Sequence, residues 1–202
     1  MSVSETSGPQ PLWRAGWYRP ARQVASPNHG MRPHGQAIDL VMIHSISLPP
    51  GRYGGDEIEH FFTNRLDASA HPYFETLRSV EVSAHFVVRR EGELLQFVSC
   101  ADRAWHAGRS SFQGRENCND FSIGIELEGL EGEAFAPAQY RALTRLLRDL
   151  RAAYPIEHVA GHEHVAPGRK ADPGAAFDWR GLQAVLGWPA ACFPALPQGA
   201  AG

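Results

Sequence analysis

The stretch FSIGIELEG, residues 121–129, decides the fold class that the sequence predicts. Its side chains alternate between large apolar residues and polar or small residues, which is the period of a β-strand. The apolar members share one face and are Phe121, Ile123, Ile125 and Leu127; the other face carries Ser122, Gly124, Glu126 and Glu128. We therefore expect a strand that buries one face in a core and holds polar side chains on the other.

Strand-like and helix-like segments alternate on both sides of this stretch. AIDLVMIHSI (37–46) is a mostly apolar run typical of a buried strand, and residues 83–98 contain two strand-like runs around a Glu91-Gly92 turn. Ile58, Phe61 and Phe62 have helical spacing, and residues 137–154 carry an apolar helical stripe that starts at a proline. EHVAGH (157–162) predicts a short strand that ends at His162.

This alternation predicts an α/β fold with a central mixed β-sheet flanked by helices. No internal repeat or linker interrupts it, so we expect a single domain over residues 12–190. Residues 1–11 are polar with Pro and Gly, and residues 191–202 have a similar loop-like composition. We expect both ends to be disordered tails.

Composition excludes several classes of partner. The 202 residues carry a net charge of −3, so they lack the excess of Lys and Arg that is typical of a nucleic-acid-binding protein. Four arginines on the predicted helix 137–154 are expected to form a solvated face: Arg141, Arg145, Arg148 and Arg151. No apolar run is long enough to span a bilayer, and the N-terminus has no hydrophobic signal segment. We therefore expect a soluble, cytoplasmic protein that binds neither nucleic acid nor membrane, and a monomer.

The three cysteines Cys100, Cys118 and Cys192 are far apart in the sequence and include no CxxC pair. This pattern favours neither a disulfide framework nor a thiolate zinc site, and it is typical of a reducing compartment.

Ionisable residues end three of the predicted strands or lie near their ends: His44, Glu126 and His162. Ligands of open α/β sheets tend to bind outside the carboxyl ends of the strands, so we expect these side chains to meet in a cleft. The next segment, GHEHVAPGRKADPG (161–174), adds Lys170 and Asp172. Its Gly and Pro content argues against a regular helix and predicts a loop.

Two histidines and a carboxylate are a suitable set for catalytic zinc, which takes three protein ligands and keeps one position open. His44, His162 and Asp172 would supply that set. Glu126 could then take a proton from water, and Lys170 could stabilise an oxyanion. The pattern alone leaves other triads open because eight further histidines compete: His29, His34, His60, His71, His85, His106, His158 and His164.

Five motifs carry a resemblance to a known family. They are MIHSISLPPGRYGG, HPYF, VSAHFVVRREGELLQFV, RAWHAGRSSFQGRENCNDFSIGIELEG and GHEHVAPGRKADPGAAFDW, in this order within residues 13–182. The sequence resembles the cytoplasmic 1,6-anhydro-N-acetylmuramoyl-L-alanine amidases. These are zinc amidases that share their fold with peptidoglycan recognition proteins.

The resemblance implies a zinc enzyme that cuts the amide between anhydro-muramic acid and L-alanine in small soluble muropeptides recycled from the cell wall. It implies the metal ligands His44, His162 and Asp172, the general base Glu126 and the oxyanion-stabilising cation Lys170. His164 is not a ligand in the family pattern.

Three positions depart from the family pattern: Ser45, where Asn is usual, and Glu81 and Asn117, where Arg is common. The resemblance implies that these positions face the substrate, so we expect weaker discrimination among peptide stems. Arg109 and Arg115 lie nearby in sequence and could compensate.

Two other hypotheses remain at this point. One is a non-catalytic muropeptide-binding module on the same fold, and the other is a lytic amidase acting on intact peptidoglycan. The presence of all five site residues favours the enzyme over the binding module.

Overall fold

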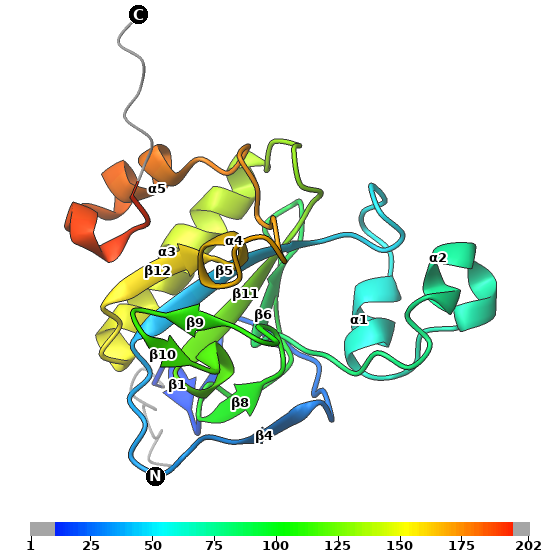
Figure 1. The fold of residues 1–202 in the computed structure, drawn as a ribbon, viewed down its shortest axis with the longest axis horizontal. Helices are drawn as coiled ribbons and strands as arrows, with labels where there is room; N and C mark the ends of the chain where they lie inside the picture. Colours follow the sequence, from blue (N-terminus) through cyan, green and yellow to red (C-terminus); the bar gives the residue numbers. More distant parts are fainter. Residues whose placement is uncertain (1–10, 196–202) are drawn as a thin grey trace, which may run out of the picture.

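A six-stranded β-sheet forms the centre of the molecule in the computed structural model, which describes residues 11–195 (Figure 1). Its strands, in spatial order, are β12 (His158–Gly161), β5 (Leu40–Ile46), β11 (Ser122–Glu128), β6 (Phe86–Val88), β7 (Leu94–Gln96) and β3 (Arg22–Gln23). The first four run parallel to one another, whereas β6 and β7 are antiparallel and β7 and β3 are parallel. The predicted mixed sheet is therefore confirmed.

The remaining strands form three small antiparallel pairs: β1 (Trp13–Arg14) with β2 (Trp17–Tyr18), β4 (His29–Met31) with β8 (Asp102–Ala104), and β9 (Ser111–Phe112) with β10 (Arg115–Glu116). The α-helices are α1 (Glu57–Phe62), α2 (Pro72–Glu75), α3 (Pro137–Ala153), α4 (His162–Val165) and α5 (Trp179–Leu186). Three short 3₁₀ helices complete the described elements: η1 (Ala68–Ala70), η2 (Cys118–Asp120) and η3 (Ala190–Cys192).

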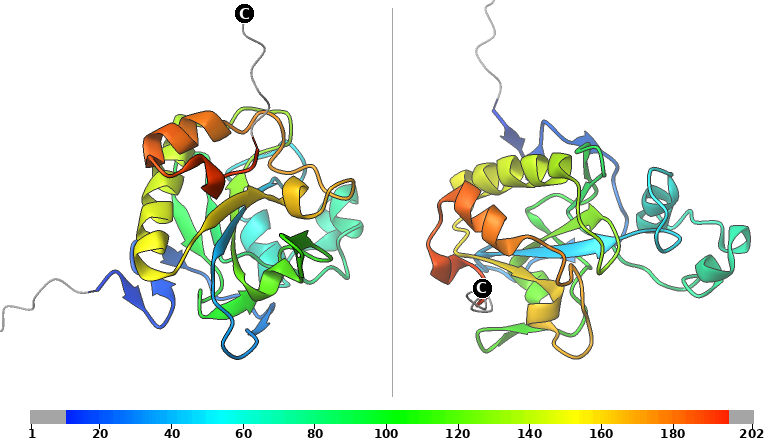
Figure 2. Two further views of the ribbon diagram at one scale, coloured as in Figure 1. Left: turned by 60° about the vertical axis from the view of Figure 1, so that its left-hand side comes forward. Right: turned by 90° about the horizontal axis from the view of Figure 1, so that it is seen from above.

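Helices α3 and α5 cover one face of the sheet (Figure 2). The apolar side chains of β11, Ile123, Ile125 and Leu127, pack there against Leu143 and Leu147 of α3. All five side chains are fully buried, so this face is the main core of the protein. The helical stripe is thus confirmed, and so is the predicted strand face for Ile123, Ile125 and Leu127. Phe121, expected on the same face, precedes β11 and packs in another apolar cluster with Leu40 and Met42. The four arginines of α3 are exposed as expected.

The opposite face of the sheet carries the polar side chains of β11. Next to it, α1 and α2 stand out as a lobe on one side of the molecule (Figure 1), with Phe61, Phe62 and Phe74 in a second apolar cluster. This arrangement leaves the carboxyl ends of β5 and β11 between the lobe and the segment that follows β12.

The register of the parallel strands aligns the candidate residues. Glu126 of β11 is paired with His44 of β5, and Gly161 at the end of β12 is paired with Ile43. His162 therefore follows at the level of His44. Three residues separated by up to 118 positions in sequence thus reach the same edge of the sheet.

Two expectations need correction. The predicted loop 161–174 starts with the four-residue helix α4, so His162 opens a helix and does not close the strand. The chain also stays ordered beyond residue 190, because η3 covers Ala190–Cys192 and Phe193 packs in the main core. Residues 1–10 and 196–202 of the predicted tails lie outside the described residues.

Within residues 11–195, no helix has the length and apolar character needed to cross a membrane. The cysteines Cys100, Cys118 and Cys192 are all buried and unpaired in this part of the chain.

A buried ion pair joins the end of β11 to the residue that follows β6. Glu128, only 1% exposed, accepts a hydrogen bond from Arg89 at 3.1 Å. Its carboxylate also accepts the backbone N–H groups of Gly54 at 2.7 Å and Arg90 at 3.0 Å. Because the carboxylate lies so deep, it depends on these donors for stabilisation.

We expect Arg89→Met to lower the free energy of unfolding by about 3–5 kcal/mol, the usual cost of leaving one partner of a buried ion pair uncompensated. Urea denaturation measures this. Arg78→Met is the matched control, because Arg78 makes a similar contact to Glu75 on the surface and should change stability little. Equal losses in the two variants would contradict the role given to the buried pair.

Candidate active site and metal centre

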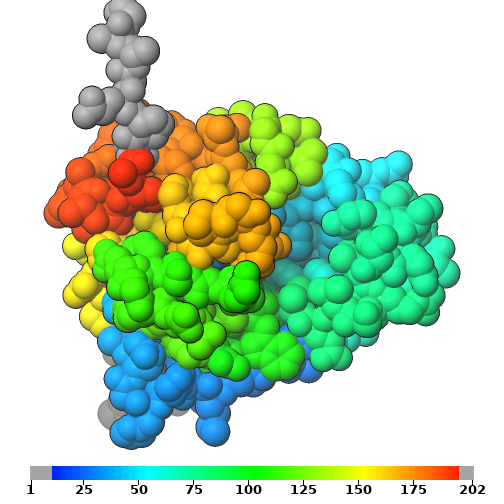
Figure 3. Space-filling view, in the orientation of Figure 1, coloured from blue at the N-terminus to red at the C-terminus, as the bar shows by residue number. Residues whose placement is uncertain are grey.

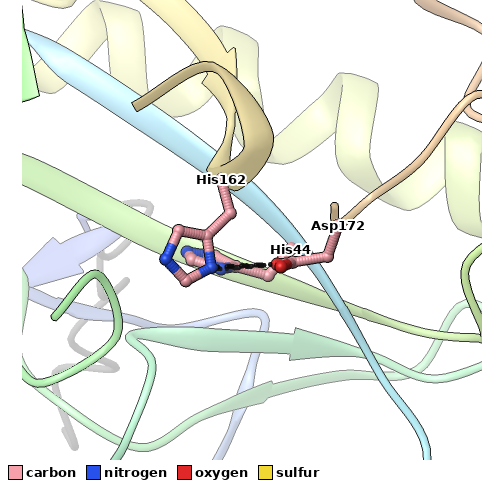
Figure 4. Close-up of side chains that lie close together, drawn as sticks. All are labelled: His44, His162 and Asp172. Atoms are coloured by element: carbon pink, nitrogen blue, oxygen red, sulfur yellow. Dashed lines mark hydrogen bonds and ion pairs between the residues drawn. The ribbon is translucent and has the colours of Figure 1, made fainter. Parts of the chain in front are cut away.

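Three side chains meet at the carboxyl end of β5 (Figure 4). Nδ1 of His44 lies 3.0 Å from Nδ1 of His162 and 3.0 Å from Oδ2 of Asp172. Nδ1 of His162 lies 3.1 Å from the same oxygen, so the three atoms form a nearly equilateral triangle. All three residues are buried. The predicted zinc ligands therefore come together, although they belong to a strand, a helix and a loop.

The second nitrogen of His162 defines the chemistry of this triangle. Nε2 lies 3.0 Å from the carbonyl oxygen of Ala107, which can only accept a hydrogen bond. The ring proton is therefore on Nε2, and Nδ1 presents a lone pair to Asp172. Two electron-pair donors 3.1 Å apart repel each other unless a cation lies between them. Two imidazoles and a carboxylate fit zinc well, because each bonds it at about 2.0–2.2 Å.

Burial keeps His44 in the protonation state that a metal needs. It lowers the pKa of His44 to about 4, so its imidazole is neutral at physiological pH. Metal ligands must be deprotonated, so a neutral His44 favours binding of a cation.

Glu126 lies next to His44 in the register of β11 and β5. Its Oε2 is shielded from solvent and has no hydrogen-bond partner among the described residues. Burial, together with the nearby charge of Asp172, raises the pKa of Glu126 well above its ordinary value. A carboxylate with a raised pKa and a free oxygen is suited to take up and release a proton.

A cavity of about 520 Å³ joins these residues to the surface. Its walls include Trp105 and the lobe residues Tyr73 and Leu77, and the triad, Glu126 and Lys170 also line it. Figure 3 shows the hollow between the cyan-to-turquoise lobe and the green and orange segments. Lys170 is exposed, and within residues 11–195 its ammonium makes no hydrogen bond or ion pair. This cation is therefore available to a negatively charged group in the cavity.

Backbone hydrogen bonds shape the loop that carries Lys170 and Asp172. The N–H of Glu163 donates to the carbonyl oxygen of Asp172 at 2.9 Å, and the N–H of Lys170 donates to Ala166 at 3.0 Å. The guanidinium of Arg169 donates to the carbonyl oxygens of Ala107 and Arg109, both at 2.6 Å. These contacts fold the loop back so that Asp172 returns to His162.

The three departures from the family pattern lie at different distances from this centre. Ser45 lines the main cavity, whereas Glu81 is exposed between two of its lining residues. Asn117 lines a separate cavity of about 400 Å³ together with Arg109 and Arg169. The guanidinium of Arg115, which was expected to be able to compensate, donates to both carboxylate oxygens of Asp39 at 2.8 and 2.9 Å.

The competing histidines do not join the triangle. Nδ1 of His164 accepts the N–H of Gly161 at 3.0 Å, and its ring packs against Trp179, which is a structural role. His106 is the residue that sequence analysis missed, because its Nδ1 lies 3.0 Å from Nε2 of His44. Its position in RAWHAG gave no periodic or spacing signal that set it apart from the other histidines.

Comparisons with known proteins agree with this site. Residues 34–175 match the Amidase_2 family, described as N-acetylmuramoyl-L-alanine amidase. The 1,6-anhydro-N-acetylmuramyl-L-alanine amidase AmpD of Escherichia coli (strain K12) is 49% identical over 177 residues, which cover 87% of this chain and 97% of that protein.

Two solved structures support the same fold. A crystal structure of an AmpD derivative is similar with a TM-score of 0.85 and 48% identity, covering 87% of this chain and 99% of that one. The human peptidoglycan recognition protein PGRP-IβC, in complex with glycosamyl muramyl pentapeptide, has a TM-score of 0.56 and 19% identity, covering 87% and 98% of the two chains. At that identity the second likeness concerns the fold alone, and it confirms the predicted fold class.

The raised pKa of Glu126 gives a testable dependence of stability on pH. In the metal-free protein the native state holds this proton more tightly than the unfolded chain, so ionisation of Glu126 opposes folding. Its contribution to stability therefore falls as pH rises from the ordinary glutamate pKa, about 4.3, through the raised value.

Glu126→Gln removes this ionisation. We expect the metal-free variant to be more stable than the wild type at pH 7, and this gain to vanish near pH 4. Urea denaturation in the presence of a chelator at both pH values measures the difference. Glu131→Gln, which changes another carboxylate of the same cavity, serves as the control. A Glu126→Gln protein less stable than the wild type at pH 7 would contradict the pKa argument.

Proposed function

The chain belongs to the family of N-acetylmuramoyl-L-alanine amidases, and we propose that it acts as a zinc enzyme on 1,6-anhydro-muropeptides. It hydrolyses the amide between anhydro-N-acetylmuramic acid and L-alanine, the step that recycles cell-wall fragments. One observation carries the proposal: three metal-ligating atoms lie within 4.8 Å of one another in the cavity that also holds Glu126 and Lys170. The alternatives of a binding module and of a lytic amidase are not favoured.

Zinc held by His44, His162 and Asp172 would supply a Lewis acid for amide hydrolysis. Glu126 takes a proton from the attacking water at its free Oε2 and returns a proton to the departing nitrogen of L-alanine. Lys170 donates to the oxygen of the amide carbonyl as it becomes negatively charged. Tyr73 and Leu77 line the lobe side of the cavity and offer apolar surface to the rest of the substrate.

A cytoplasmic location is part of this proposal. Three unpaired cysteines fit a reducing compartment, where disulfides rarely form. The substrate would then be a small muropeptide that has already been released from the wall.

Mass spectrometry tests the activity directly. Purified protein should release the tripeptide from an anhydro-muramyl-tripeptide, and a chelator should abolish the release. The same protein should leave intact sacculi uncut. Cleavage of sacculi at a comparable rate would favour the lytic amidase, and binding without cleavage would favour the binding module.

We expect His162→Ala to lose stoichiometric zinc, because the remaining two ligands cannot complete a three-ligand site. Metal analysis of the purified variant measures this. His164→Ala is the matched control, because this histidine lies two residues away and, within residues 11–195, its one hydrogen bond is to the backbone N–H of Gly161. It should retain zinc. A full equivalent of zinc in His162→Ala would overturn the ligand assignment.

Glu126→Ala and Lys170→Ala should both retain zinc and lower kcat by about 10² or more, as expected for loss of a proton acceptor or an oxyanion donor. Steady-state kinetics with the anhydro-muramyl-tripeptide measures the effect. Glu131→Ala, which also alters the lining of the cavity, should keep kcat close to the wild-type value. A near-normal kcat in either test variant would remove that residue from the mechanism.

The departures Glu81 and Asn117 predict weak discrimination among peptide stems. An arginine grips a carboxylate with two charge-assisted hydrogen bonds, which neither residue can provide. We expect kcat/KM for stems ending in diaminopimelate and in lysine to differ by only a few-fold. The double variant Glu81→Arg/Asn117→Arg should shift the ratio toward diaminopimelate by roughly 10-fold or more. A preference of about a hundredfold in the wild type would show that other groups, such as Arg109 and Arg169, provide the contact.

A further inference from the structure

His106 contacts the metal centre from outside the ligand triangle. Its Nδ1 lies 3.0 Å from Nε2 of His44, the nitrogen that points away from His162 and Asp172. Its other ring nitrogen, Nε2, lies 3.3 Å from Oγ of Ser122. A neutral imidazole has one N–H and one lone pair, so these two contacts have opposite directions.

A hydroxyl group fixes those directions. Oγ of Ser122 donates its only proton to the carbonyl oxygen of Cys118 at 2.6 Å. It therefore accepts a proton at its contact with Nε2 of His106, which is 3.3 Å away. The proton of His106 is then on Nε2, and its Nδ1 accepts a hydrogen bond.

The consequence reaches the metal site. Because Nδ1 of His106 accepts, Nε2 of His44 must carry the proton and donate it. Nδ1 of His44 then has a lone pair, which faces His162 and Asp172 at 3.0 Å. His162 reaches the same state through the carbonyl oxygen of Ala107. Two adjacent residues, His106 and Ala107, thus hold the outer nitrogens of both ligand imidazoles.

The position of the His106 ring is itself built into the sheet. A Cβ atom placed on Gly124 would come within 2.5 Å of Cγ of His106, so only glycine at this position of β11 leaves room for the ring. The side-chain oxygen of Asn119 accepts the backbone N–H groups of His106 at 3.1 Å and Ala107 at 2.8 Å. Asn119 therefore holds the backbone of His106, and β11 at Gly124 limits the positions that its ring can take.

We propose that His106 is a positioning residue that locks His44 in the tautomer whose Nδ1 lone pair faces the metal, with Ser122 setting the direction of the hydrogen bonds. This inference rests on the zinc site of the proposed function. Groups that orient metal ligands in this way typically contribute 10- to 100-fold to metal affinity or activity. His106 acts through His44 and need not touch the substrate.

The experiment measures the zinc dissociation constant of the loaded protein by competition with a chromogenic chelator. His106→Leu should weaken zinc binding by about 10- to 100-fold. His106→Asn should recover most of that loss, because its amide oxygen can accept the proton of His44. Ser122→Ala keeps the imidazole ring of His106 and removes the group that accepts its proton, so it should also weaken zinc binding. This variant tests the proposal if His106→Leu does not fold.

His85→Leu is the matched control. His85 is a buried histidine whose ring packs against His106 at 5.6 Å between centroids, and its Nδ1 accepts the N–H of Gly124 at 3.0 Å. Its loss should lower stability and leave the zinc affinity near that of the wild type. An equal loss of affinity in His85→Leu would assign the effect to packing and overturn the proposal.

Two other results separate this inference from the proposed function. A wild-type protein that binds no stoichiometric zinc would overturn the metal site itself. A wild type that binds zinc and loses it in His44→Ala, while His106→Leu binds as tightly as the wild type, would overturn the role of His106 alone. Asparagine and leucine variants of equal zinc affinity, both weak, would also overturn it, because rescue by an acceptor is its specific prediction.

Discussion

The parallel register of β12, β5 and β11 is the constraint on which the site depends. Pairing of Glu126 with His44, and of Gly161 with Ile43, fixes the height of three functional side chains at one edge of the sheet. Side chains alternate along a strand, so a slip by one residue would turn His44 and Glu126 into the apolar core and bring Ile43 and Ile125 to the cavity. Burial of the apolar face against α3 therefore also fixes the strand register that positions the polar side chains.

Local patterns were enough to predict the elements that build this edge. The alternation in 121–129 predicted both faces of β11, and the stripe in 137–154 predicted α3, because each pattern reflects burial within one element. The small strand pairs β1–β2 and β9–β10 have only two residues per strand, too short for any periodicity to be recognised. Helix α4 was missed because its four residues lie among glycines and prolines that favour a loop.

Some residues of the candidate site could also be predicted from the sequence, and others could not. The residue types of His44, His162 and Asp172 suggested a zinc site, but ten histidines in the sequence left the choice of triad open until motif resemblance was considered. The tertiary structure brings these three together and excludes His164 through its bond to Gly161. The contact of His106 with His44 depends on a loop crossing the end of a strand 62 residues away, and no local pattern encodes it.

The backbone hydrogen bond between Glu163 and Asp172 has a consequence for metal affinity. It closes the segment between two ligands, His162 and Asp172, before any ion arrives. If this segment were disordered, part of the free energy of ion binding would be lost to the entropy cost of closing the loop. Here the loop is already closed in the folded protein, so ion binding does not carry that cost. A metal site at these residues would therefore be preorganised, because the contacts that order the loop also place two of its ligands. Loosening the segment anywhere along its length would weaken chelation even with every ligand intact.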